Sequence, residues 1–582
     1  RVLMYPFHAS PDPRYSLTGA ATGYHLTFNP TNLRSKYLDF TSLTIFFSFF
    51  LFFFLFFFFL SQKAISENFI ASRFTLGILL VTPGKIVFIL CWSLMLRLFL
   101  QSSTVSQIFT KMPQTAHYHT IVVGSGLAGL TTALKLSEKG FSVALVEKTA
   151  SLGGNSIKAS LGINGVPTKY QNNDDTVDAF IKDTTVSGKG LCDKQLVEYL
   201  AKDSASAITW LTDEIKVDLS AVSQLGGHSF ARTHRGSGKL PPGFAIVSAL
   251  TKRIKESPNV EIMTQTLLQS FLKDGSKVQG VVVDKVDADG AHTQESIAAE
   301  NVVLATGGFL ADTDSQDSLI RQFRPDLIDL PLTNGQQTTG DGHRLANFGL
   351  DAKLVQMDQI QVHPTGFVQL KDATTKSSKW KFLCGELIRG IGGILLSSKT
   401  GKRFVDELST RDNVTAGIMG SCDNRVAAVI VSEEDYKKAA AHIDFYMFQL
   451  LMFKGTAEDV CVKLREIDAN LGLTEQAIDS SLQSYNNIVK THSDPLGRTH
   501  FGHEIEPTFY FGFVTPVLHF TMGGVETNKH RQIVQKSGVA IPNVYAVGEL
   551  SAGVHGANRL AGSSLLECVV FGTRVADHIS RK

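Results

Sequence analysis

The chain has 582 residues, with 56 Lys and Arg against 54 Asp and Glu, so its formal net charge is +2. Apolar residues make up 43% of the chain and charged residues 19%. This balance excludes a disordered chain and a basic nucleic-acid-binding protein, and the length allows two to four domains. The 49 glycines favour a loop-rich α/β protein.

The six cysteines lie far apart, at positions 91, 192, 384, 422, 461 and 568. No CxxC or CxxCH pattern occurs, so attached haem and cysteine-rich iron–sulfur ligation are not expected, and no metal site is predicted. Widely spaced thiols in a long chain favour a reducing compartment over a disulfide scaffold.

Residues 1–116 differ from the rest of the chain, with nine basic residues and only three acidic ones. The run TSLTIFFSFFLFFFLFFFFL at 41–60 is apolar enough to span a membrane, but it also reads like a translated polypyrimidine tract outside the native coding sequence. A cleaved targeting peptide beginning at Met95, or a start at Met112, are further alternatives. Membrane contact is expected only if this segment belongs to the protein, and cytoplasmic and mitochondrial locations both stay open.

A dinucleotide-binding unit is predicted from residue 119 onward. HTIVVG (119–124) is a strand pattern, GSGLAG (124–129) is a glycine-rich turn into a helix, and FSVALVE (141–147) is a second strand. The three glycines of the turn permit a tight bend, close approach of a pyrophosphate, and close helix–strand packing. Glu147 is placed to accept hydrogen bonds from a ribose, and Glu147→Ala should weaken cofactor binding without altering the phosphate turn.

Further glycine-rich segments recur along the chain and favour FAD, a long ligand held from both ends. SLGGNSIKASLGINGV (151–166), NVVLATGG (301–308) and NGQQTTGDG (334–342) come first. NVYAVGE (543–549) and GVHGANRLAGSSLLECVVFG (553–572) then aim a second helix N-terminus at a ligand. The predicted cofactor contacts are Gly124, Ser125, Gly126, Ala128, Gly129, Glu147, Lys148, Gly153, Gly154, Asn155, Ser156, Ser160, Gly162, Ala305, Thr306, Gly307, Asp341, Gly548, Glu549, Arg559, Ser563, Ser564, Leu565 and Leu566.

The segments GSGLAG, GGNS, ATGG, TGDG, QVHPTG, GKRFVDELSTRD, HFTMGG and GVHGANRLAG occur in that order. Together they resemble the fumarate reductase/succinate dehydrogenase flavoprotein family, above all its soluble, fungal-type FAD-dependent fumarate reductases. The resemblance covers residues 117–582. It implies an α/β fold, in which a discontinuous Rossmann-type FAD-binding domain (117–360 and 519–582) carries an inserted α+β capping domain (361–518).

Reducing fumarate requires cationic groups for two carboxylates, a hydride from the flavin and an acid for the second carbon. Taken alone, a His before Pro or an Arg beside an Asp is an ordinary loop or surface feature. The resemblance implies more specific roles: Arg411 donates the proton, Glu386 and Arg389 resupply it, and His363, His519 and Arg559 hold the carboxylates. His363 is also a catalytic candidate.

Two positions depart from the family pattern. Gly385 stands where the family often has Thr, so one substrate hydroxyl contact is expected to be absent or replaced. Ser156 matches the position of a flavin-attaching His, which implies noncovalent FAD and a diffusible electron donor such as reduced free flavin. Alternative functions are another flavoenzyme of the same fold, such as a ketosteroid dehydrogenase or an aspartate oxidase, and a membrane-anchored redox sensor built on an inactive flavin domain.

Overall fold

The computed structural model describes residues 117–238, 240–370 and 379–582. All of these residues belong to one compact unit. The expectations for residues 1–116 lie outside the described residues. Within the described ranges, no helix is both long enough and apolar enough to cross a membrane.

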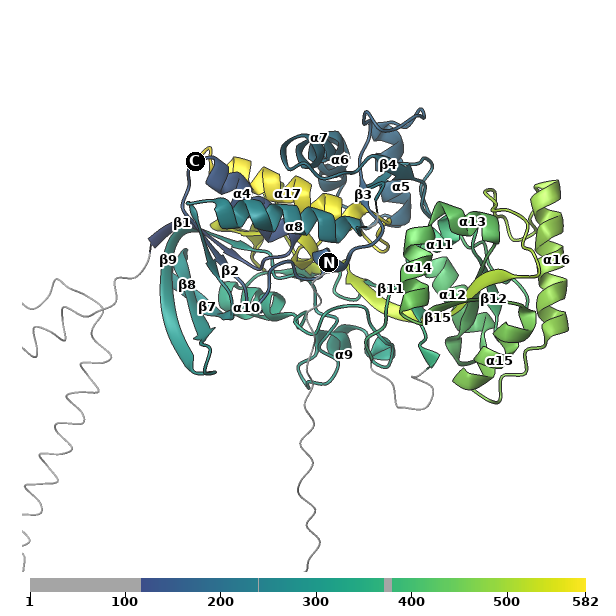
Figure 1. Ribbon diagram of the computed structural model, residues 1–582. Coiled ribbons are helices and arrows are strands. Elements are labelled where there is room, and N and C mark those ends of the chain that lie inside the picture. The colour runs from purple at the N-terminus through teal and green to yellow at the C-terminus, as the bar shows by residue number, and fades with distance from the viewer. Residues whose placement is uncertain (1–116, 239, 371–378) are drawn as a thin grey trace, which may run out of the picture. The chain divides into compact units, whose positions relative to one another are not determined.

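A large mixed sheet forms the first layer of the structure (Figure 1), with the strand order β17-β18-β9-β1-β2-β6 and with β8 and β7 continuing from β9. The strands β18, β9, β1, β2 and β6 are parallel, whereas β17, β8 and β7 pair in antiparallel fashion. Their bounds are β1 His117–Val123, β2 Val143–Val146, β6 Val260–Met263, β7 Thr266–Asp274, β8 Lys277–Val286, β9 His292–Leu304, β17 Gln532–Val534 and β18 Ala540–Ala546.

The parallel strands are apolar on both faces because both faces are covered. In β1, Val122 joins a core on the face that carries the helices, whereas Ile121 and Val123 join a second core on the opposite face. The helices α4, α8 and α17 lie together over the first face in Figure 1. The helices of this region are α4 Leu127–Glu138, α5 Val177–Ser187, α6 Lys194–Lys202, α7 Ser204–Thr209, α8 Pro242–Glu256, α9 Leu319–Phe323, α10 Asp341–Leu350 and α17 Ser563–Ile579.

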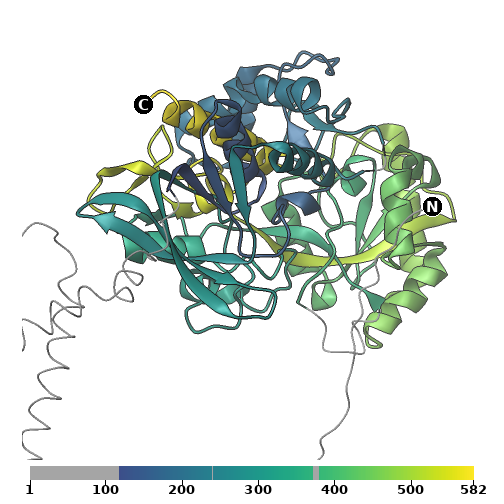
Figure 2. The same ribbon diagram turned by 60° about the vertical axis from the view of Figure 1, so that its left-hand side comes forward.

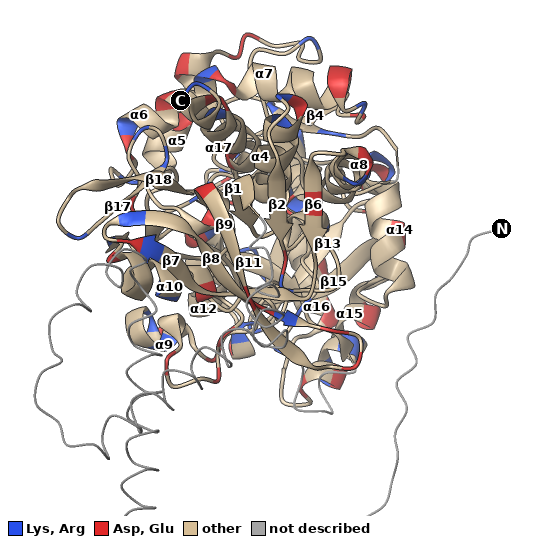
Figure 3. Cartoon of the chain, turned by 90° about the vertical axis from the view of Figure 1, so that its left-hand side faces the viewer, with Lys and Arg blue, Asp and Glu red and all other residues tan. Residues whose placement is uncertain are grey.

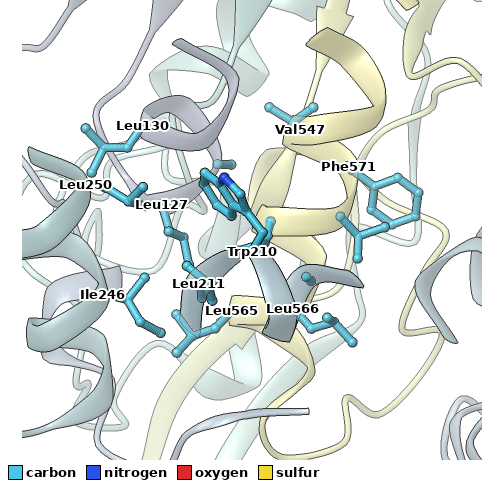
Figure 4. Close-up of a cluster of buried hydrophobic side chains, with 14 of the residues drawn as sticks. Leu127, Leu130, Trp210, Leu211, Ile246, Leu250, Val547, Leu565, Leu566 and Phe571 are labelled. Carbon is cyan, nitrogen blue, oxygen red and sulfur yellow. The ribbon is translucent and has the colours of Figure 1, made fainter. Parts of the chain in front are cut away.

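The apolar core beneath these helices is shown in Figure 4. The indole ring of Trp210 is 5% exposed and lies among side chains of α4, α8 and α17, including Leu127, Leu250 and Leu565. The ammonium group of Lys135 lies 4.2 Å from the centre of the Trp210 ring, a cation–π contact at the rim of the core. This core fixes α4 and α17 against each other, although nearly the whole chain separates them.

An antiparallel sheet of five strands forms the second part, with the order β11-β15-β13-β12 and with β14 also paired to β15. Its strands are β11 Ile360–Phe367, β12 Ile394–Ser397, β13 Ala427–Val431, β14 Met452–Gly455 and β15 Phe509–Thr521. Its helices are α11 Leu387–Gly390, α12 Arg411–Ser421, α13 Glu433–Lys438, α14 Ala440–Phe448, α15 Ala457–Ile467 and α16 Glu475–Thr491. Smaller elements are the three-stranded sheet of β3 Ile163–Asn164, β5 Thr233–Arg235 and β4 Ala221–Ser223, and the pair β10 Leu354–Val355 with β16 Gly524–Val525.

The strand β15 leads from this sheet back to the region of the large sheet, and Figure 2 shows it as a long yellow-green ribbon. At its end, the backbone N–H of Thr521 donates to Glu549 Oε1, 3.0 Å away. The domain boundary expected after residue 518 therefore falls inside a continuous strand, and the division into domains stays a prediction. Around both sheets, acidic and basic residues are interspersed, many of them on helices and connecting segments (Figure 3).

The close contact between the first turn and α4 generates a test of the fold. A Cβ on Gly129 would lie 1.9 Å from the carbonyl oxygen of Gly124. Gly129→Ala should therefore separate the helix from the strand, lower the free energy of unfolding by about 1–3 kcal/mol and reduce bound flavin. The measurement is chemical denaturation together with the ratio of flavin to protein.

The matched control is Gly420→Ala in α12, where an added Cβ meets no atom within 4 Å. It should be neutral or stabilising, because alanine is favoured over glycine in a helix by about 1 kcal/mol. Equal behaviour of the two variants would contradict the packing described for Gly129.

Candidate active site

A cavity of about 680 Å³ lies at the ends of the parallel strands and is lined from both ends of the chain. Most of the predicted cofactor residues line it: Gly124, Ser125, Gly126, Ala128, Glu147, Lys148, Gly154, Asn155, Ser156, Ser160, Gly162, Ala305, Thr306, Gly307, Asp341, Gly548, Glu549, Arg559, Ser564 and Leu565. Four others lie behind the wall and support it: Gly129, Gly153, Ser563 and Leu566. Gly153, for example, donates its N–H to the Ser125 carbonyl, 3.0 Å away.

Two helix N-termini contribute to this cavity. The helix α4 begins after Gly126, and α17 begins after Gly562, so the N-terminal ends of both helices, with the positive ends of their dipoles, lie at the cavity wall. A Cβ on Gly126 would meet only Ser156 Oγ, at 3.7 Å, so the backbone here is open to a close ligand. These features fit the phosphates of a dinucleotide.

Glu147 is more deeply involved in the turn than the sequence suggested. Its Oε2 accepts the Ser125 N–H at 2.9 Å and the Ser125 hydroxyl at 2.6 Å, while its Oε1 accepts the N–H and hydroxyl of Thr149. The expectation that Glu147→Ala would leave the phosphate turn unaltered is therefore wrong, because this carboxylate holds Ser125 in the turn. A ribose contact at Glu147 stays a prediction.

A buried ion cluster lies at the junction of the two sheets. Arg411, the first residue of α12, donates from Nε to Glu386 Oε2 at 2.9 Å, and Arg389 Nη2 lies 3.7 Å from the same oxygen. Burial alone would raise the pKa of Glu386, but the charges of Arg411 and Arg389 and the N–H of Gly226 outweigh it, and the pKa is lowered. Glu386 is therefore an ionised carboxylate shared by two guanidinium groups.

Gln361 joins Arg559 to this cluster. Its side-chain oxygen accepts from Arg411 Nη1 at 2.8 Å and from Arg559 Nη2 at 3.1 Å. Burial, together with the nearby charge of Arg411, lowers the pKa of Arg559 to about 9, so the group remains a cation at neutral pH. Among the described residues Arg559 has no carboxylate within ion-pair distance, and its Nε has no hydrogen-bond partner.

The two predicted histidines lie together, with ring centres 5.2 Å apart. Burial is the main cause that lowers the pKa of His363 and of His519 well below the ordinary value. Neighbouring positive charges add to this effect, and for both rings the charge of Arg411 contributes most among them. They are therefore neutral, which corrects the expectation that they belong to a cationic set. His519 Nδ1 lies 2.8 Å from the hydroxyl of Thr333.

The neutral His363 ring has a defined direction. Its Nδ1 accepts the backbone N–H of Thr365 at 3.2 Å, so the ring hydrogen lies on Nε2. Nε2 is buried and has no partner among the described residues. His363 therefore keeps one buried N–H donor that is free to form a hydrogen bond.

The predicted site residues divide between the cavity wall and the cluster behind it. His519 and Arg559 line the cavity, whereas His363, Glu386, Arg389 and Arg411 do not. Gly385, directly before Glu386, is buried and donates its N–H to the hydroxyl of Tyr446 at 3.2 Å.

Sequence reasoning missed Gln361 and Asn558. Gln361 Nε2 donates to Asn558 Oδ1 at 2.9 Å and to the carbonyl oxygen of Arg559 at 2.8 Å, which fixes both partners. Their positions could have indicated them, because Gln361 lies in the motif QVHPTG and Asn558 in GANRLAG, and both motifs contain a predicted site residue.

Comparisons with known proteins agree with this geometry. The family described as FAD binding domain matches residues 119–565. Fumarate reductase 1 of Saccharomyces cerevisiae is 45% identical over 475 residues, covering 79% of this chain and 98% of that protein. The fumarate reductase of Schizosaccharomyces pombe is 36% identical over 492 residues, covering 81% and 92%.

A solved structure supports the same assignment. The open conformation of a flavocytochrome c3 fumarate reductase matches with a TM-score of 0.64 and 29% identity, covering 82% of this chain and 80% of that one. The chain belongs to the FAD-binding flavoprotein family that includes the fungal fumarate reductases. The α/β fold with a Rossmann-type FAD-binding domain and the assignment of FAD as cofactor are thereby confirmed.

The side chain of Ser156 generates a test of how FAD is held. Its hydroxyl accepts the N–H of Leu127 at 3.1 Å, and so it supports the first turn of α4. The resemblance implies that Ser156 stands at the position of a flavin-attaching histidine, and on that expectation acid precipitation of the holoprotein should release all of the flavin into the supernatant. Flavin absorbance that remains with the washed pellet would contradict noncovalent binding.

Proposed function

We propose that this flavoprotein is a fumarate reductase, which converts fumarate to succinate. The observation that carries the proposal is a buried excess of positive charge. Arg389 and Arg411 share the carboxylate of Glu386, while the buried Arg559 has no carboxylate in ion-pair contact among the described residues. Buried charges without a partner are costly, and a small dianion would balance this one.

The relatives support the same reaction. Both yeast relatives bear the name fumarate reductase, and they align over most of their length with this chain. A steroid substrate would place an apolar ring system where these guanidinium groups lie, so the ketosteroid alternative is disfavoured.

The hydrogen bonds of Arg411 favour it as the proton donor. Nε is bonded to Glu386 and Nη1 to Gln361, which leaves Nη2 buried and without a partner among the described residues. An arginine is a very weak acid, so it can protonate only a strongly basic centre. A carbanion developing on the substrate is such a centre. Glu386, 2.9 Å from Arg411, can then take up a proton and pass it to Arg411, which restores the acid.

Binding and proton supply are divided among the chain's own groups. FAD, when bound and reduced by the electron donor, would supply the hydride for one alkene carbon. Arg559 and the N–H of His363 hold carboxylate oxygens, His519 contributes at the cavity wall, and Arg389 passes protons to Glu386.

For the electron donor, we propose a diffusible reductant such as reduced free flavin. No three His, Cys, Asp or Glu side chains gather as metal ligands within the described ranges. The sequence also lacks the CxxC spacing of common iron–sulfur and haem sites. Any contribution of a membrane depends on residues 1–116, which lie outside the described residues.

Replacing Arg411, the proposed proton donor, should slow the reaction without affecting the binding of FAD. Arg411→Ala should lower kcat for fumarate reduction by about 10²–10⁴, because a general acid is lost, while the flavin spectrum stays normal. Steady-state kinetics with reduced free flavin as donor measure the effect. Arg465→Ala, on the exposed face of α15, serves as the control and should retain full activity. A near-normal kcat in Arg411→Ala would exclude Arg411 as the acid.

Arg559 and Glu386 should give a different kinetic pattern. Arg559→Ala should chiefly raise KM, because the residue holds the substrate and the transition state alike. Glu386→Gln should lower kcat with little change in KM, because it interrupts proton return and not substrate binding. If both variants change KM and kcat in the same proportions, the division of roles is wrong.

A further inference from the structure

The space around Gly385 could accommodate a small side chain, and the hydroxyl of Tyr446 lies next to that space. A Cβ built on Gly385 would lie 3.4 Å from Tyr446 Oη, 3.5 Å from Ser160 Oγ and 3.4 Å from Leu161 Cδ2. These are ordinary van der Waals distances, and Gly385 does not have a positive φ. Neither backbone strain nor a clash therefore requires glycine here.

Tyr446 is held firmly in this place by α14. Its side chain is 4% exposed, its ring lies 4.7 Å from that of Phe367, and its hydroxyl oxygen accepts the N–H of Gly385 at 3.2 Å. The hydroxyl hydrogen has no acceptor in the part of the chain that the structure describes. Burial raises the pKa of Tyr446, so the group stays protonated and keeps this hydrogen.

This unused donor belongs to a residue that lines the cavity. Tyr446 lines the same cavity as His519 and Arg559, and so does Ser160, whose hydroxyl is buried without a partner. On the other side, the hydroxyl of Thr365 donates to the carbonyl oxygen of Cys384 at 2.9 Å, and the N–H of Thr365 donates to His363. These bonds connect the backbone before Gly385 to the His363 ring.

We propose that Tyr446 is a substrate-binding residue, whose hydroxyl donates a hydrogen bond to a carboxylate of the bound dianion. The Tyr446 hydroxyl would take the place of a side-chain hydroxyl at position 385, where this chain has glycine. The inference rests on the proposed function, and it assigns to α14 a direct part in recognising the substrate. A neutral donor adds no charge, so it orients a carboxylate that the arginines attract.

The test is Tyr446→Phe, which removes the hydroxyl and keeps the ring against Phe367. Its KM for fumarate should rise about tenfold with little change in kcat, because a buried hydrogen bond to a charged group is lost. The affinity of the oxidised holoprotein for fumarate, followed by the change in flavin absorbance, should fall by a similar factor. Tyr436→Phe is the matched control, because it removes an exposed hydroxyl bonded to Asp444.

A second substitution distinguishes binding from packing. Removing the phenol oxygen frees space for a hydroxyl at position 385, so Gly385→Ser in the Tyr446→Phe protein should reverse most of the rise in KM. The proposal is overturned if KM is unchanged in Tyr446→Phe, or if it rises and Gly385→Ser does not reverse the rise. Failure of the unsubstituted holoprotein to bind or reduce fumarate would instead contradict the proposed function.

Discussion

The ion pair between Arg411 and Glu386 is the interaction on which the rest of the site depends. Each group is buried, so each would be destabilising without the other. Their separation of 2.9 Å requires two distant segments to meet, the turn before α11 and the N-terminus of α12. Gln361 on β11 then joins the pair to Arg559, which belongs to the loop before α17.

The fold supplies this meeting point through its long strands. The strand β15 pairs with β13 and with β11, and its last residue, Thr521, also contacts Glu549 in the flavin-binding region. Burial raises the pKa of Glu549 to about 7, so this nearby carboxyl is only a partial counter-charge for Arg559 at neutral pH. The excess of positive charge thus follows from the architecture, because the three arginines come from different elements and their side chains are all buried.

The sequence was sufficient for the features that are local or repeated. The turn at Gly124 and the helix after it follow from spacing alone, and the glycine-rich loops at both ends correctly indicate one long cofactor. The sequence did not predict the features that depend on contacts between residues far apart in the chain. The neutral state of His363 depends on burial beside Arg411, the second role of Glu147 on its bond to Ser125, and the hydroxyl at position 385 on Tyr446, which lies 61 residues away.

The most direct test of the central claim is a single turnover of the reduced flavin. The holoprotein is reduced with dithionite without oxygen, freed of excess reductant and mixed with fumarate, or with crotonate, in which a methyl group replaces one carboxylate. We expect complete reoxidation by fumarate with stoichiometric succinate, and far slower reoxidation by crotonate, because the arginine cluster requires a dianion. Flavin that stays reduced with fumarate, or equal rates with both acids, would contradict it.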